Sequence, residues 1–326
     1  MADIRAQATP VISPRQVLII LAALAAVSIV AFMVIGAKGN WSFILPFRGA
    51  KIWSMATIGT AIAIATVLFQ TITANRMLTP SIMGFDSLYV LLQTGLVFLL
   101  GGLGYAAIPP EAKFALEVVL LTGAALLLFG SVLGSGLNDL FRMLLVGVIF
   151  GVLFRSLTAL LQRLIDPNEF AVVQGAMFAS FNRTDTRLLL VSAVLILACC
   201  LLAWRKRHVL DVMALGRDHA ISLGLNHRRE LFAGLALVSV LVATSTALVG
   251  PVAFFGLLVS ALSYEIIRSS HHGGLLIGSV LIAVIVLVGG QTLFERVLGM
   301  GGSLSIVVEF LGGLVFLFLI LRRVRA

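Results

Sequence analysis

The chain has 326 residues, of which 60% are hydrophobic and 11% charged, and its mean hydropathy is +1.12. This composition is too apolar for a soluble domain and fits repeated membrane crossings. The apolar runs are continuous, with no strand-like alternation, as expected of lipid-immersed helices that satisfy their own backbone hydrogen bonds. The sequence therefore predicts an all-α polytopic membrane protein with a single domain over residues 1–326, and it excludes a β-barrel.

The net charge of +9 comes from basic residues in short segments beside the apolar runs. Basic residues there set the orientation of membrane helices and contact anionic lipid head groups, so the charge does not predict a nucleic-acid partner. The two cysteines, Cys199 and Cys200, adjoin one another inside an apolar run. They are interpreted as small packed side chains with no disulfide framework.

Ten segments are predicted to insert in the membrane, judged against the roughly 20 apolar residues that cross a bilayer. The first is longer than a signal-peptide core and precedes a poor cleavage site, so we expect it to remain as a span. The eighth is short and follows Gly250-Pro251, which ends the preceding helix. An even number of spans, with basic residues near both ends, places both termini in the cytoplasm. The segments are 17–35, 52–74, 87–103, 114–133, 140–161, 188–204, 231–249, 252–262, 275–290 and 306–321, with an interfacial or re-entrant helix expected within 166–187.

Residues 210–225 form the longest polar connection, and together with the flanking segments 205–208 and 226–230 six Lys/Arg residues lie between two apolar runs. The positive-inside rule places this loop in the cytoplasm. Asp211 and Asp218 are expected to cap two short helices that Gly216 and Gly224 end, because glycine adopts the left-handed conformation that closes a helix. Two short helices between two spans indicate a docking surface, and an ordinary basic loop is the alternative.

The chain has four lysines, none of which follows a glycine, so it lacks the Gly-Lys-Ser/Thr phosphate loop. If ATP drives this protein, the ATPase is a separate chain. The spacing of Cys and His predicts no metal site, and no nucleophile–base pair is evident. The adjacent His271 and His272 are interpreted as solvated polar residues of a cytoplasmic turn. We expect no catalytic residue, metal or cofactor of its own in this chain.

Three stretches carry a resemblance to a known family. The first runs from Arg48-Gly-Ala-Lys51 through Leu68-Phe-Gln70 to Asn75-Arg-Met-Leu-Thr-Pro80. The second is the central loop, with Ala214-Leu-Gly216 and Leu223-Gly-Leu225, and the third is Gly250-Pro-Val-Ala-Phe-Phe-Gly-Leu257. On these motifs, which span nearly the whole chain, it resembles the FecCD-type permeases. These are the membrane subunits of ABC importers for iron–siderophore complexes, haem and cobalamin.

The resemblance implies a type II ABC importer permease fold with ten spans and a pathway between two permease subunits, each seated on an ATPase. It implies a substrate-binding protein outside and a ferric siderophore as substrate. Residues 75–86 are similar to the branch that serves catecholate and mixed siderophores such as petrobactin or vibriobactin. The chain departs from the family at Arg76, Lys51 and Ser260-Ala261, which replace a proline, an arginine and Pro-His. Which chelate is carried, and whether the partner permease is a second copy or a relative, stay open.

The resemblance also implies three sets of functional residues. Coupling helices at about 211–225 face the ATPase, basic residues on the outer rim meet the binding protein, and a third set follows the translocation path. Arg48 and Lys51, at i and i+3, face one way, and Arg296 is placed on the other edge. The coupling set is Leu215, Gly216, Arg217, Asp218, Leu223, Gly224 and Leu225, the docking set is Arg48, Lys51 and Arg296, and the path set is Gln70, Asn75, Pro80 and Arg155.

Simpler interpretations of these residues stay open. Basic side chains at a membrane interface also lie there by snorkelling, which applies to the docking set and to Arg155 near the outer end of the fifth span. Pro80 forbids continuation of the helix and predicts a rigid turn near the ATPase side, and a plain span-to-span connection is the alternative.

A secondary transporter is the rival class, because Glu117, Glu265 and Glu309 lie within apolar runs and intramembrane carboxylates often relay protons. Internal symmetry between halves, common in such carriers, is not evident. A membrane enzyme is a third class, with no catalytic constellation in its favour. The prediction is therefore the permease subunit of an ABC importer for a ferric siderophore in the bacterial inner membrane.

Overall fold

A computed structural model describes residues 13–37, 39–134, 140–177, 179, 185–269, 271–299, 307–315 and 317. All regular secondary structure in this part of the chain is helical, and η1 is a 3-10 helix whereas η2 and η3 are π-helical. In chain order the elements are α1 (Pro14–Val34), α2 (Trp41–Ile72), η1 (Pro80–Met83), α3 (Phe85–Ala107), α4 (Pro110–Gly134), α5 (Leu140–Leu164), α6 (Pro167–Met177), α7 (Thr186–Arg205), α8 (Arg207–Met213), α9 (Arg217–Ser222), α10 (His227–Val249), α11 (Phe255–Ile267), α12 (His272–Val284), η2 (Ile285–Gly289), α13 (Gly290–Thr292) and η3 (Leu293–Val297).

The predicted membrane helices are confirmed. Within the described residues, seven helices are long and apolar enough to cross a membrane: α1, α2, α3, most of α5, α7, α10 and the continuous helix His272–Val297. The 25-residue α4, the short α11 and the helical residues 307–315 complete a set of ten. The ninth span is longer than predicted, because α12 continues through η2, α13 and η3. Residues 1–12 and 318–326, on which the placement of both termini rests, lie outside the described part.

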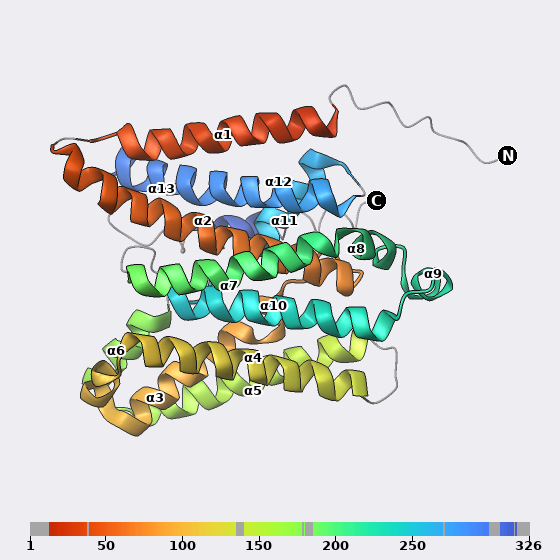
Figure 1. Ribbon diagram of the computed structural model, residues 1–326. Helices are drawn as coiled ribbons and strands as arrows, with labels where there is room; N and C mark the ends of the chain where they lie inside the picture. Colours follow the sequence, from red (N-terminus) through yellow and green to blue (C-terminus); the bar gives the residue numbers. More distant parts are fainter. Residues whose placement is uncertain are drawn as a thin grey trace.

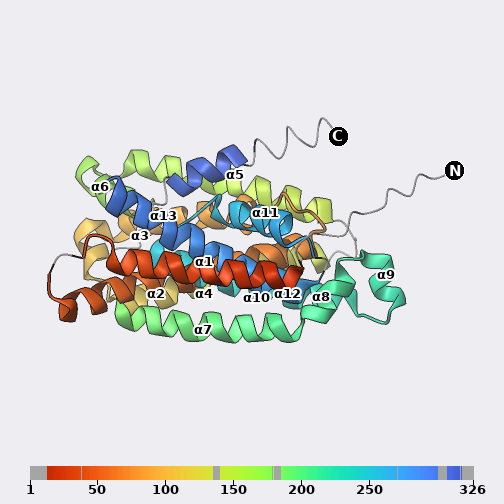
Figure 2. The ribbon, with the colours of Figure 1, turned by 90° about the horizontal axis from the view of Figure 1, so that it is seen from above.

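Helices α2 and α10 form the centre of the bundle. Of their apolar stretches, 67% and 61% of the residues are buried, against 17% in α1, α3 and α5. In Figure 1, α1, α12, α2, α10 and α4 lie one below another, and each neighbouring pair is in contact. Figure 2 shows α7 along one face of this stack and α5 and α6 on the opposite face. The outer helices present apolar side chains outward, such as Leu103 (91% exposed), as a lipid-facing surface requires.

A glycine contact fixes where α3 begins. Gly84 has φ +94°, a conformation that lets the chain turn from η1 directly into α3. A Cβ atom at Gly151 of α5 would lie 3.3 Å from Gly84 Cα, and one at Gly84 would lie 3.0 Å from Gly151 Cα. The two backbones therefore cross at a distance that small residues allow, so that α3 begins against the middle of α5.

Helices α8 and α9 project from one end of the bundle, on the right in Figures 1 and 2. The predicted N-caps were wrong, because Asp211 lies inside α8 and Asp218 lies in the first turn of α9. Gly216 follows the end of α8 and is itself the N-cap residue of α9. Gly224, with φ +85°, follows the last turn of α9 and closes it as predicted. Asp211 is not a cap because its carboxylate has partners elsewhere in the fold. We call this the α8–α9 end and the other the opposite end.

Candidate functional site

The loop at the α8–α9 end presents apolar side chains to solvent. Leu215, Ile221 and Leu223 are 58%, 48% and 63% exposed, while Leu210 and Ala220 are buried and anchor the two helices. An exposed apolar group set among charged residues is typical of a protein-docking surface. The rest of the predicted coupling set lies on the same loop, where Arg217, Asp218 and Gly224 are exposed and Gly216 and Leu225 are half-buried.

Asp211 joins α8 to the start of α12. The backbone N and the ring Nδ1 of His272 both lie 2.7 Å from Asp211 Oδ1. Burial raises the pKa of Asp211, but these hydrogen bonds and the attraction of His272 and His271 outweigh burial and hold the pKa below its ordinary value. The carboxyl group is therefore ionised throughout the physiological range.

His272 is buried, with 4% of its surface exposed, so the interpretation of a solvated histidine pair was wrong for this residue. Its Nε2 lies 2.7 Å from Thr71 Oγ1 in the last turn of α2. The neighbouring His271 is the solvent-exposed member, with its side chain 80% exposed. Sequence reasoning missed His272 because nothing local distinguishes two adjacent histidines. Their different surroundings come from residues far away in the chain.

The last turn of α2 is tied to the connection that follows it. Gln70 Nε2 donates hydrogen bonds to the backbone O of Arg76 at 2.7 Å and to Ser260 Oγ of α11 at 2.9 Å. The Arg76 guanidinium lies over the Tyr264 ring of the same helix, 4.4 Å from its centroid. Gln70 therefore holds together α2, α11 and the connection 73–79.

Asn75 and Pro80 shape that connection. Asn75 Oδ1 accepts a hydrogen bond from the backbone N of Met77 at 2.9 Å, which closes a local turn. Pro80 is buried and begins η1. The structure thus gathers Gln70, Asn75 and Pro80 within one short segment. A small cavity of mixed polar and apolar lining lies beside it, bordered by residues that include Thr66, Thr79, Pro80, Asp86, Val242 and Ser245.

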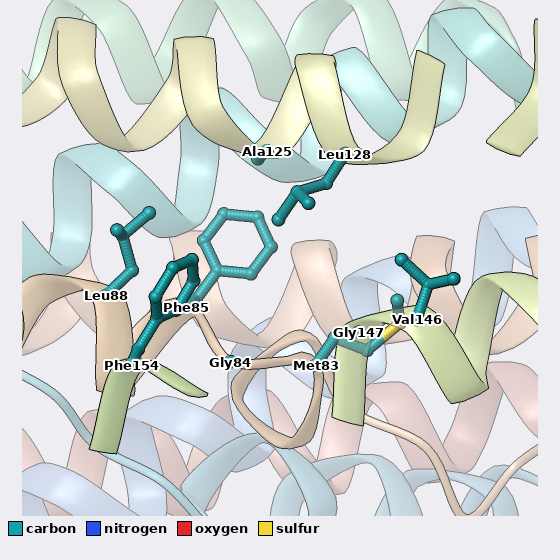
Figure 3. A pocket seen from close by; sticks show the side chains of 9 residues that line it. All are labelled: Met83, Gly84, Phe85, Leu88, Ala125, Leu128, Val146, Gly147 and Phe154. Carbon is teal, nitrogen blue, oxygen red and sulfur yellow. The ribbon is translucent and has the colours of Figure 1, made fainter. Parts of the chain in front are cut away.

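Arg155 lies apart from this segment. It is exposed on α5, and its Nη1 donates to Ser87 Oγ in the first turn of α3 at 3.1 Å. Nearby, α3, α4 and α5 enclose a narrow apolar cavity, in which Phe85 points toward Ala125 and Leu128 (Figure 3). The side chains that line that cavity are all apolar, and Arg155 follows one of them, Phe154, along α5.

The predicted docking set gathers at the opposite end around Glu295. Lys51 Nζ lies 3.1 Å from Glu295 Oε1, and Arg296 Nη2 lies 3.7 Å from Glu295 Oε2. Arg296 is thus on the same edge as Lys51, and its placement on the other edge was wrong, because η3 brings the end of the ninth span back beside α2. Gln291, one turn earlier, also donates to Glu295.

Arg48 is not directed outward. It is 5% exposed, and Nη1 donates to the backbone O atoms of Phe32, Met33 and Ile35 at 2.8–2.9 Å. Nη2 donates to Gly36 O at 3.1 Å. These carbonyls end α1 and have no partner within the helix, so a guanidinium is well suited to satisfy them. The expectation that Arg48 and Lys51 face a partner together is therefore not met by the geometry of Arg48.

The three intramembrane carboxylates have different surroundings. Glu117 of α4 is buried, accepts from Gln93 Nε2 at 2.6 Å and lies 3.9 Å from Lys113 Nζ. Lys113 and Glu117 line an open cavity of about 400 Å³ at the opposite end, between α3, α4, α6, α7 and α10. Glu265 is largely exposed and paired with Arg268, and Glu309 is half-buried. In the described residues these three carboxylates are not linked to one another in a continuous series.

Comparison with known proteins decides the family. A profile of the FecCD transport family matches residues 11–322. The chain is 43% identical over 284 residues to the petrobactin import system permease protein YclO of Bacillus subtilis, a match that covers 87% of this chain and 90% of the relative. It is 32% identical over 276 residues to the petrobactin import system permease protein FatC of Bacillus anthracis, covering 85% and 78%.

The chain belongs to the FecCD transport family. A solved structure of a metal-chelate type ABC transporter in an inward-facing conformation superposes with a TM-score of 0.81 and covers 94% of this chain and 99% of that one. At 22% identity this likeness shows the fold alone. In this FecCD protein the family motifs occupy the end of α2, the α8–α9 loop and the start of α11. Among the described residues, no group of three His, Cys, Asp or Glu is arranged to hold a metal ion.

Proposed function

We propose that this chain is the permease subunit of an ABC importer that moves a ferric siderophore across the bacterial inner membrane. Two permease subunits enclose the path, and separate ATPase subunits bind the α8–α9 end, which faces the cytoplasm together with both termini. A substrate-binding protein delivers the chelate to the opposite end. The chain contributes no catalytic group, and it alternates between outward-open and inward-open states.

The observation that carries this proposal is the α8–α9 loop on a chain of this family. Its apolar side chains face solvent although buried residues hold the helices firmly to the bundle, so the exposed face is presented for another protein. A carrier driven by an ion gradient needs no such surface. The rival mechanism also lacks support in the carboxylates, since Glu117 is already paired and Glu265 is solvated.

The substrate proposal rests on the relatives. Two proteins named as petrobactin import permeases match most of the chain. We therefore assign a ferric siderophore of the catecholate or mixed type. Lys51 and Arg296 are the proposed contacts for the binding protein, with Arg48 supporting them through α1, and Gln70, Asn75, Pro80 and Arg155 border the path.

Leu223→Asp is the direct test of ATPase coupling. The exposed leucine takes part in no core packing, so the fold should persist while the charge opposes docking. Co-purification of the ATPase should fall, and ATP-driven uptake into proteoliposomes should fall about tenfold or more, the result of losing about 1.4 kcal/mol of docking energy. Ala107→Asp, an exposed site at the opposite end, is the control and should retain the ATPase. Normal uptake by Leu223→Asp would contradict the coupling role.

A further inference from the structure

The hydrogen-bond chain Asp211–His272–Thr71 connects three helices through one side chain. Asp211 is on α8, His272 is the first residue of α12, and Thr71 is in the last turn of α2. Both contacts of the imidazole measure 2.7 Å. An ionised carboxylate only accepts hydrogen bonds, so Nδ1 carries the proton on the α8 side.

We propose that the hydrogen bonds Asp211–His272–Thr71 are the link through which displacement of α8 by the ATPase moves the end of α2. The proposal rests on the proposed function, since it needs an ATPase at the α8–α9 end. His272 acts as a positioning residue: it touches neither substrate nor nucleotide, but couples the helix beside the docking surface to the central helix of the bundle.

The geometry of His272 suits transmission. Its ring is rigid, so the positions of Nδ1 and Nε2 cannot adjust separately, and the backbone N of His272 shares the same Asp211 Oδ1. His272 and Thr71 are 4% and 8% exposed, so water does not substitute for a broken contact. In such surroundings an unpaired polar group costs free energy. The linked helices therefore move together more readily than they separate.

From Thr71 the displacement reaches the connection 73–79, which follows α2. Gln70, the preceding residue, bonds to Arg76 O and to Ser260 Oγ. A shift of the last turn of α2 therefore pulls on the connection that holds Asn75 and on α11. This route ends beside the small cavity that Pro80 lines between α2 and α10.

Helix α8 also packs directly against α2, but among the described residues the other polar contacts at the α8–α9 end do not join these two helices. Lys206 pairs with Glu230 and ties the end of α7 to the start of α10. His208 and His271 lie 3.9 and 3.6 Å from Asp211 Oδ2, but both are exposed and neither reaches α2. Glu230→Gln therefore disrupts an ion pair at this end and leaves the link intact, which makes it the matched control.

The test uses the complete transporter, with ATPase and binding protein, in proteoliposomes, and measures siderophore carried per ATP hydrolysed. Thr71→Val removes the hydroxyl at nearly constant volume, and Asp211→Asn removes the charge. Each should lower the ratio by about fivefold or more, as a lost coupling of 1–3 kcal/mol implies. ATPase co-purification and unstimulated ATP hydrolysis should persist in Thr71→Val. Thr71→Ser should restore the ratio, and Glu230→Gln should not change it.

The double variant separates a transmission link from local damage. If the three residues act as one chain, Asp211→Asn combined with Thr71→Val should be no worse than the more impaired single variant. Multiplied effects, or an unchanged ratio in both single variants, would overturn the proposal. If Thr71→Val does not fold, His272→Gln replaces it, because a flexible amide cannot hold both neighbours as the ring does. If the wild-type complex shows no ATP-driven siderophore uptake, that result contradicts the proposed function itself.

Discussion

Single charged residues in this protein are explained by what their side chains contact. Arg48 and Arg155 illustrate the range: the first is buried and bonded to the carbonyl end of α1, and the second is exposed with one contact to Ser87. A buried guanidinium with satisfied donors stabilises the fold, whereas an exposed one beside an apolar surface is available to an anion.

Arg155→Gln is predicted to slow uptake of an anionic ferric siderophore about tenfold, the equivalent of about 1.4 kcal/mol, and that of a neutral one much less. The reason is that charge attraction is strong in surroundings of low dielectric constant. Uptake of one chelate of each kind into proteoliposomes measures the difference. Arg163→Gln, exposed on the same helix, is the control. Equal slowing of both chelates would show that Arg155 does not sense ligand charge.

At the scale of elements, close helix packing depends on glycine at particular crossings. A Cβ at Gly256 of α11 would lie 2.2 Å from Thr66 Oγ1 and 3.3 Å from Thr66 Cβ on α2. Threonine is β-branched and cannot swing aside easily. The contact of α11 with α2 is therefore set by this glycine, and with it the position of Ser260 beside Gln70.

Gly256→Ala is accordingly predicted to destabilise the detergent-solubilised protein by about 1–3 kcal/mol, the usual cost of overpacking. The measurement is thermal unfolding, recorded as the loss of monodisperse protein with rising temperature. Gly95→Ala in α3 is the matched control, since a Cβ there meets nothing within 4 Å and alanine favours the helix. Equal melting temperatures for the two variants would show that α11 adjusts freely.

Over the whole molecule, the two ends of the bundle have different partners in the proposed function. Around Glu295, three cations (Arg48, Lys51 and Arg296) and one carboxylate form a cluster with a net charge of +2 at the opposite end. Lys51 and Arg296 are the members nearest solvent, although each is partly covered. An acidic partner docking here would be attracted over a distance of about 8 Å at physiological salt.

The paired reversal Lys51→Glu with Arg296→Glu changes the net charge of the cluster from +2 to −2, so it is predicted to weaken association of an acidic substrate-binding protein and to reverse the dependence on salt, which then screens a repulsion. Association rates measured over a salt series test this. Arg48→Gln serves as the contrast: it should lower thermal stability by about 2 kcal/mol or more, since hydrogen bonds to charged groups are lost, and change the salt dependence much less than the paired reversal does. A salt-independent wild-type association would contradict the docking proposal.

The sequence by itself determined the membrane helices, the short α11, the polar loop whose helix α9 is closed by Gly224, and the family motifs. These features follow from the transfer of individual segments into lipid and from local backbone preferences, which neighbouring residues specify. Only the tertiary structure decided that Asp211 bonds His272, that Arg48 donates to the carbonyls at the end of α1 and that Arg296 lies beside Lys51. Asp211 and His272 are 61 positions apart in the sequence, and Lys51 is 244 positions from Glu295, which also contacts Arg296. Such pairings depend on which helices become neighbours, and the charge or polarity of one residue does not record its partner.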